Sequence, residues 1–116
     1  MKIKIDEILK ALSEPTRIKI LCIIYVRNVN LCNIVDFLGL SYPTISIHIK
    51  TLKEIGIIEV QKNGRWQELS LCKNNKNKII KFIIDNFELL FEDYLLNKKE
   101  IKKLDQIIEQ KSCNIT

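Results

Sequence analysis

The sequence predicts a small, mainly α-helical domain that carries one β-hairpin. Three observations lead to this prediction. Apolar residues recur at helical spacing through most of the chain, one short stretch switches to strand-forming residues around an Asn-Gly pair, and glycine and proline are scarce, at 3 and 2 residues. A chain of 116 residues builds one modest core, so we expect a single domain over residues 1–116.

Two amphipathic helices are expected at the N-terminal end. Apolar residues at the spacing i, i+3, i+4, i+7 predict a helix over residues 4–12, with Ile5 as the first of them. Pro15 suits the first turn of a second helix, over about residues 15–27. Proline has no backbone N–H, but the N–H groups of a first turn have no partner within the helix. Asn28, Val29 and Asn30 interrupt that helix.

The next segment predicts two helices separated by a tight turn, over about residues 31–55. A short helix over about 31–38 ends at Gly39, which readily adopts the left-handed conformation of a C-cap. Ser41 is a good N-cap for the following helix. The inward face of that helix consists of Ile45, Ile49 and Leu52.

A β-hairpin and a long helical stretch complete the expected fold. The hairpin spans about residues 57–71, and Asn63-Gly64 between its two β-rich runs is a strong turn signal. From about residue 74 to 111 the chain has no glycine or proline and predicts helix. Its apolar stripe contains Ile80, Ile83, Ile84, Phe87, Leu90, Phe91 and Tyr94.

This order of elements is that of a winged helix-turn-helix, a fold that binds double-stranded DNA. The second helix of the pair, over about 41–55, is then the recognition helix, and the hairpin is the wing. Polar side chains on the recognition helix are suited to base edges, and basic side chains at the wing tip are suited to phosphates or the minor groove. The expected DNA-contacting residues are Ser41, Tyr42, Thr44, Ser46, Ile47, Lys50, Lys62 and Arg65.

The charge of the chain supports an anionic partner. The net charge is +5 and the pI is near 9.0, and the excess of basic residues falls within residues 1–81. No signal sequence or apolar run long enough to span a membrane is present, so we expect a cytoplasmic protein without membrane contact. Nucleophile-elbow, P-loop and zinc-protease motifs are absent and there is one histidine, which argues against an enzyme.

Three segments resemble the ArsR/SmtB family of winged-helix repressors. They are LKALSEPTRIKIL (9–21), LGLSYPTISIHIKTLKEIGII (38–58) and KNGRWQELSL (62–71). The resemblance implies a homodimer that pairs through the helices expected at 4–12 and 74–111. It also implies an inverted-repeat operator that is released when a soft metal ion, arsenite or another thiol-reactive signal binds.

The resemblance also singles out one position on the recognition helix. Relatives often carry a basic residue where this chain has Ile47. An isoleucine cannot hydrogen-bond to guanine, which leaves two interpretations: an apolar contact with a thymine methyl group, or packing against the wing.

The four cysteines are the candidate inducer ligands, and no other cofactor is expected. Zinc-sensing relatives use Asp and His on the long helix, but the chain's one histidine, His48, lies outside that helix. A single histidine beside an apolar face is more often a structural residue than a metal ligand. Arsenite-type relatives have Cys-Val-Cys where this chain has Asn30 and Cys32, so Cys32 would need a further thiol from Cys113 or Cys72. Cys22 corresponds to a persulfide-sensing position and offers a redox alternative; inert cysteines in a ligand-independent regulator are a third.

Overall fold

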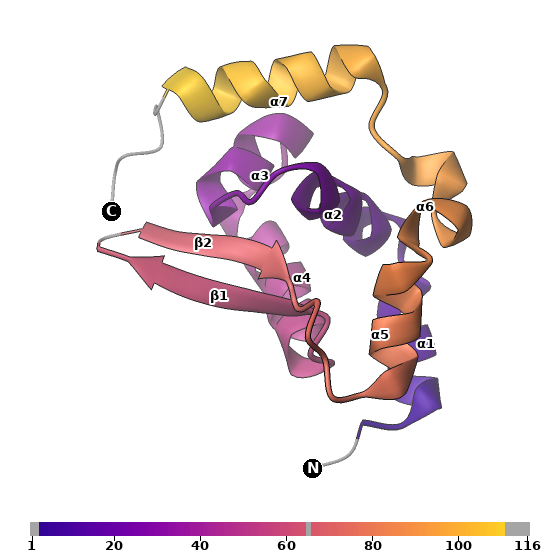
Figure 1. Cartoon of the computed structure of the whole chain (residues 1–116). Coiled ribbons are helices and arrows are strands. Elements are labelled where there is room, and N and C mark those ends of the chain that lie inside the picture. The colour runs from indigo at the N-terminus through magenta and orange to yellow at the C-terminus, as the bar shows by residue number, and fades with distance from the viewer. Residues whose placement is uncertain (1–2, 65, 111–116) are drawn as a thin grey trace.

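The computed structural model describes residues 3–64 and 66–110, and it contains a two-stranded hairpin that extends from one edge of a group of helices (Figure 1). The helices before the hairpin are α1 (Ile5–Leu12), α2 (Pro15–Val26), α3 (Leu31–Leu38) and α4 (Tyr42–Glu54). The strands are β1 (Ile58–Asn63) and β2 (Trp66–Leu71). The later elements are α5 (Lys78–Asp85), α6 (Phe87–Leu90), the 3₁₀ turn η1 (Glu92–Tyr94) and α7 (Lys98–Gln110).

The helix-turn-helix pair, α3 and α4, has the boundaries that the sequence predicts. Asn30 and Asn33 form a reciprocal cap at the start of α3: each side-chain oxygen accepts from the other's backbone N–H, at 2.8 and 3.1 Å. At its other end, Gly39 has a φ of 69°, and its N–H donates to the Val35 carbonyl. Gly39 therefore defines where α3 ends and where the turn to α4 begins.

The hairpin is antiparallel, and it is joined to the helices through its second strand. The register pairs Ile58 with Leu71 and continues to the end of the hairpin, where Gly64 has a φ of 66°. Beside β2, the backbones of Val29 and Leu69 exchange two hydrogen bonds of 2.7 and 3.3 Å. This bridge ties the wing to the segment that leads into α3.

One apolar core holds α1 to α5, the hairpin and the C-terminal elements together. Completely buried side chains come from α1, α2, α3, α4 and α5, among them Ile8, Ile20, Ile34, Ile45 and Ile80. Burial of an aliphatic side chain of this size stabilises a fold by about 1.5–3 kcal/mol. Within residues 3–64 and 66–110, no helix combines the length and the apolar character needed to cross a membrane.

The C-terminal third differs from the single long helix that the sequence predicts. The chain leaves helical geometry at Asn86, and a non-helical connection over residues 95–97 separates η1 from α7. Apart from Leu90, which is 48% exposed, the apolar stripe is largely buried within the protomer. There the Phe87 ring stacks on Tyr25 with ring centroids 4.5 Å apart and is tilted against Phe91 at 4.7 Å. The prediction of one continuous helix was wrong because the stripe packs back against α2.

Helix α7 packs over α2 and α3 of the same chain, as Figure 1 shows. Leu104 is fully buried there. Two ion pairs join it to α2 or its C-cap: Lys19 to Glu100 at 3.1 Å and Arg27 to Asp105 at 2.9 Å. The hydrogen bond from the Asn97 backbone N–H, together with the pairing with Lys19, lowers the pKa of Glu100.

A further contact joins α7 to the C-terminal end of α3. The Lys103 ammonium donates to the Phe37 carbonyl at 3.1 Å and lies 4.7 Å from the centre of the Phe37 ring. A cation is favourable at this end of a helix, where carbonyl groups lack intrahelical partners. The C-terminal helix thus supports the first helix of the helix-turn-helix pair.

Replacing Leu104 with alanine is expected to reduce the free energy of unfolding by about 2–5 kcal/mol, because a fully buried leucine leaves a cavity. Urea unfolding followed by circular dichroism measures the change. Gln106→Ala, at an exposed position of the same helix, is the control and should leave the stability within about 0.5 kcal/mol. Equal stability of both variants would show that α7 is not docked in solution.

Candidate nucleic-acid interface

Helix α4 is anchored by one face and exposed on the other. Ile45, Ile49 and Leu52 are 0–7% exposed and pack in the core, as the sequence predicts. Ser46 and Lys50, between them in sequence, are exposed. A helix held in this way presents polar side chains at fixed positions, which is the requirement for reading base edges in a major groove.

Two of the predicted contact residues also form the cap of α4. The Ser41 hydroxyl accepts from the Thr44 backbone N–H at 3.3 Å, and the two hydroxyls lie 2.9 Å apart in a hydrogen bond. Both residues are exposed. Each hydroxyl keeps further hydrogen-bonding capacity for a phosphate oxygen while it fixes the start of the helix.

Two large side chains stand out from the first half of α4. Tyr42 is 47% exposed and Ile47 is 66% exposed. Of the two interpretations offered for Ile47, burial of its side chain against the wing does not match this exposure. An exposed isoleucine on this helix is available for an apolar contact.

The wing carries one described basic residue near its tip. Lys62 is exposed and faces Gln67 across the hairpin register. Arg65, the other predicted wing contact, lies outside the described residues. Lys62 alone therefore represents the expected phosphate contact of the wing in this structure.

His48 joins α4 to the start of α2. Its Nε2 lies 3.8 Å from Oε2 of Glu14, the N-cap residue of α2, and its Nδ1 is buried without a hydrogen-bond partner among the described residues. In the ranges 3–64 and 66–110, no group of three His, Cys, Asp or Glu side chains could hold a metal ion. This placement fits a structural histidine at a helix contact.

Two of the candidate cysteines are free thiols with raised pKa values. Cys22 is fully buried in α2, and burial raises its pKa to about 11. Cys72 follows β2 and is half-buried; burial and a hydrogen bond with Glu59 raise its pKa. Thiolates are the reactive and metal-binding form of cysteine, so neither environment favours reaction at neutral pH.

Cys32 differs from both of these residues. It is half-buried in the first turn of α3, and its sulfur is disulfide-bonded in the structure. Asn30, where the arsenite-type pattern has its first cysteine, serves as the N-cap of the same helix. Cys113, the further thiol expected from the sequence, lies outside the described residues.

Exposed apolar side chains lie on α1 and α5. The apolar stripe predicted over residues 80–94 did not indicate this exposure. Ile5 and Leu9 of α1 are 49% and 60% exposed, and Ile79 and Phe82 of α5 are 40% and 61% exposed. Both helices lie in the same part of the view in Figure 1. Large apolar side chains that remain exposed on a protomer are candidates for a protein–protein interface.

Comparison with known proteins identifies relatives of the same kind. A family model described as "Bacterial regulatory protein, arsR family" matches residues 14–60. An uncharacterized HTH-type transcriptional regulator of Methanocaldococcus jannaschii is 36% identical over 69% of this chain and 91% of its own length. An arsenical resistance operon repressor of Staphylococcus xylosus is 26% identical over 75% of this chain and 80% of its own.

A solved structure has the same fold. It is a homodimeric winged helix-turn-helix DNA-binding domain from Mycobacterium bovis, described as a possible ArsR-family transcriptional regulator. It is 18% identical, covers 79% of this chain and 82% of its own, and has a TM-score of 0.62. The chain therefore belongs to the ArsR family, whose members are DNA-binding winged helix-turn-helix transcriptional regulators and not enzymes.

Proposed function

We propose that the protein is a homodimeric repressor that binds an inverted-repeat operator and releases it when a thiol-binding inducer arrives. The observation that carries the DNA-binding part is the geometry of α4: its apolar face is buried and its polar face is exposed beside the wing. Two such helices in a dimer would enter successive major grooves about 34 Å apart.

The exposed apolar residues of α1 and α5 support the homodimer. A second copy would bury Leu9 and Phe82, the most exposed of this set on each helix. The solved relative described above is homodimeric by its own description. The part of the predicted dimerisation region that forms α7 packs on its own protomer, so we assign the pairing surface to α1 and α5.

Base-reading and phosphate-binding residues are expected to behave differently when replaced. Lys62→Ala should weaken binding to a selected duplex and to random duplexes alike and reduce the salt dependence by about one released counterion per site. Ser46→Ala should leave binding to random duplexes unchanged and reduce discrimination by about 1–3 kcal/mol if it contacts a base. Fluorescence anisotropy at several salt concentrations measures both, with duplexes selected from a random library.

Lys99→Ala is the control for the loss of one positive charge, since Lys99 is exposed on α7. It should change neither affinity nor salt dependence by much. If Lys62→Ala and Ser46→Ala lose the same affinity on selected and random DNA, the division between wing and recognition helix is wrong.

For the inducer we propose arsenite or a related soft metal ion, with Cys32 as the primary ligand and Cys113 or Cys72 as further thiols. The first turn of α3 favours a thiolate at Cys32, because the backbone N–H groups and the positive end of the helix dipole stabilise a negative charge there. Cys32 is disulfide-bonded, so a second sulfur atom can reach its side chain. The Staphylococcus xylosus relative is named an arsenical resistance operon repressor.

The connection from Cys32 to DNA would run through α3. This helix ends at Gly39, and the N-cap of α4 follows at Ser41, so a displacement of α3 changes the position of the recognition helix. A coupling of about 1–3 kcal/mol between the inducer-bound and DNA-bound forms is sufficient for a response of about 5–150-fold.

The disulfide also favours a second candidate, release of DNA by oxidation. A peroxide would take two electrons and two protons from Cys32 and a second thiol, which form a disulfide while the peroxide is reduced to water. Cys22, the redox position expected from the sequence, is less suited because its thiol is fully buried with a pKa of about 11. Release by peroxide in the absence of metals would favour this candidate.

A further inference from the structure

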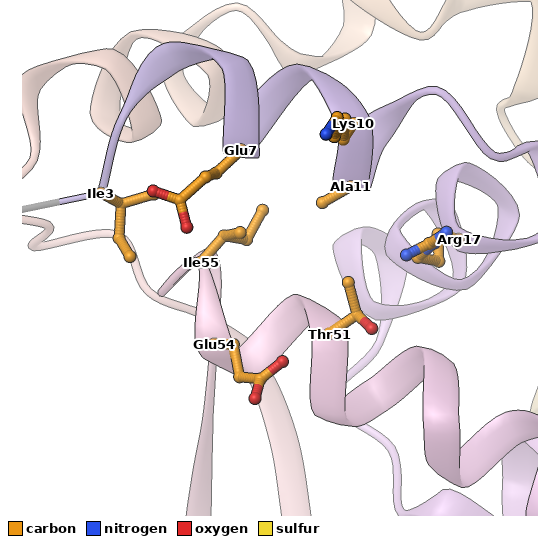
Figure 2. A pocket seen from close by; sticks show the side chains of 8 residues that line it. All are labelled: Ile3, Glu7, Lys10, Ala11, Arg17, Thr51, Glu54 and Ile55. Carbon is orange, nitrogen blue, oxygen red and sulfur yellow. The ribbon is translucent and has the colours of Figure 1, made fainter.

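A pocket of about 470 Å³ lies between α1, the start of α2 and the end of α4 (Figure 2). It is distinct from the cysteines and from the outer face of α4. Its volume falls in the range of small-molecule sites, about 300–1,000 Å³. The residues that line it are Ile3, Glu7, Lys10, Ala11, Arg17, Thr51, Glu54 and Ile55.

One buried polar atom of the lining residues has no hydrogen-bond partner among the described residues. The Nε of Arg17 is buried and makes no hydrogen bond to any described residue. An unsatisfied buried donor is costly, and a charged guanidinium forms strong paired hydrogen bonds with a carboxylate. Other polar atoms are already engaged: the Thr51 hydroxyl donates to the Ile47 carbonyl, and Glu7 accepts from the Lys4 backbone N–H.

The charges of the lining are balanced and separated. In Figure 2, Lys10 and Arg17 lie on one side of the pocket, and Glu7 and Glu54 lie on the other. Neither Lys10 nor Glu54 forms an ion pair with another described residue. A simple anion would meet two carboxylates and a simple cation would meet two basic groups, so a ligand that carries both charges fits best.

The remaining wall of the pocket is aliphatic. In Figure 2, Ala11 and Ile55 lie between the two charged sides, and Ile3 lies beside Glu7. We propose that this pocket binds a small aliphatic zwitterion, an amino acid or short peptide with free termini. Its carboxylate would pair with Arg17 and its ammonium with Glu54, and its hydrocarbon part would cover the aliphatic wall.

Titration with L-leucyl-L-leucine tests the proposal, followed by amide NMR shifts of the full chain. We expect saturable shifts confined to α1, the start of α2 and the end of α4. N-acetyl-leucyl-leucine, which lacks the ammonium, and leucyl-leucinamide, which lacks the carboxylate, should each bind at least about tenfold more weakly, the effect of one lost charged hydrogen bond.

Two variants assign the charges. Arg17→Gln should bind the dipeptide and its amide equally, and Glu54→Gln should bind the dipeptide and its N-acetyl form equally. Glu109→Gln, on the exposed side of α7, is the control and should keep both preferences. If Arg17→Gln does not fold, Glu54→Gln at its exposed position still decides.

Three results would overturn the proposal. They are the absence of shifts in this region, equal binding of the dipeptide and its blocked forms to the wild type, and unchanged preferences in Glu54→Gln. None of these measurements uses DNA or arsenite, so they are independent of the proposed repressor function.

Discussion

Replacing Phe82 with glutamate is expected to produce monomers and to weaken binding to an inverted-repeat duplex by about 100-fold or more. A charged side chain placed in an apolar interface must lose its hydration without gaining a partner. Loss of the dimer removes the second half-site contact, which contributes a factor of about 10²–10⁴ in affinity when two sites are linked. Sedimentation equilibrium and fluorescence anisotropy measure the two effects.

Lys81→Gln is the matched control, because Lys81 is exposed on the same helix and forms an i,i+4 ion pair with Asp85. It should remain dimeric. Phe87→Glu is unsuitable as a test, since the Phe87 side chain is 1% exposed and its replacement would unfold the protomer. A dimeric Phe82→Glu variant, or a monomeric wild type at micromolar concentration, would contradict the assignment of α5 to the interface.

Replacing Cys32 with serine is expected to preserve DNA binding and to abolish release by arsenite. In the reduced wild type, arsenite should raise the dissociation constant for the selected duplex by about 5–150-fold, the range typical of coupled sites. Serine keeps the size of the side chain and the N-terminal geometry of α3, but it lacks the thiolate that a soft ion needs. Anisotropy titrations with and without arsenite, in a phosphine reductant, measure the response.

Partner thiols are separated by the other cysteine variants. Cys113→Ser should reduce the response in part, and Cys22→Ala should retain it because this buried thiol is protonated at neutral pH. If Cys32→Ser responds to arsenite like the wild type, the inducer binds elsewhere. If peroxide releases DNA and metals do not, oxidation of the same cysteine is the mechanism.

Local signals were sufficient to predict the first two thirds of the fold. Gly39 has the left-handed conformation and Ser41 accepts the capping hydrogen bond, as their residue types predict. The Asn63-Gly64 pair lies at the end of the hairpin, as the sequence predicts, and β1 runs up to Asn63. These features depend on backbone preferences within a few residues, which a sequence displays directly.

The interrupted C-terminal region depends on contacts far apart in the chain. Periodicity over residues 80–94 indicates an apolar face but not what covers it, and here Tyr25 stacks on Phe87. One local signal for the start of α7 was present: Asn97 and Glu100 form a reciprocal cap, with hydrogen bonds of 2.8 and 3.0 Å. This pattern of Asn followed three residues later by Glu is a known helix start.

The candidate DNA interface was predictable in part, because the buried residues of α4 recur three or four positions apart and leave the opposite face exposed. The predicted apolar stripe includes Ile83 and Ile84 and omits Phe82, in agreement with their burial and exposure, but it did not indicate a second, exposed apolar face on this helix. The pocket beside Arg17 was also missed, because it is formed by three helices that are separate in the sequence.

Hydroxyl-radical footprinting of the reduced protein on a duplex selected from a random library tests the central claim most directly. A dimer that places two α4 helices in successive major grooves should protect two matching sets of sugars, centred about 10–10.5 base pairs apart on one face of the DNA. The protection should weaken as salt increases. A single protected segment, or no protected segment at any salt concentration, would contradict the account.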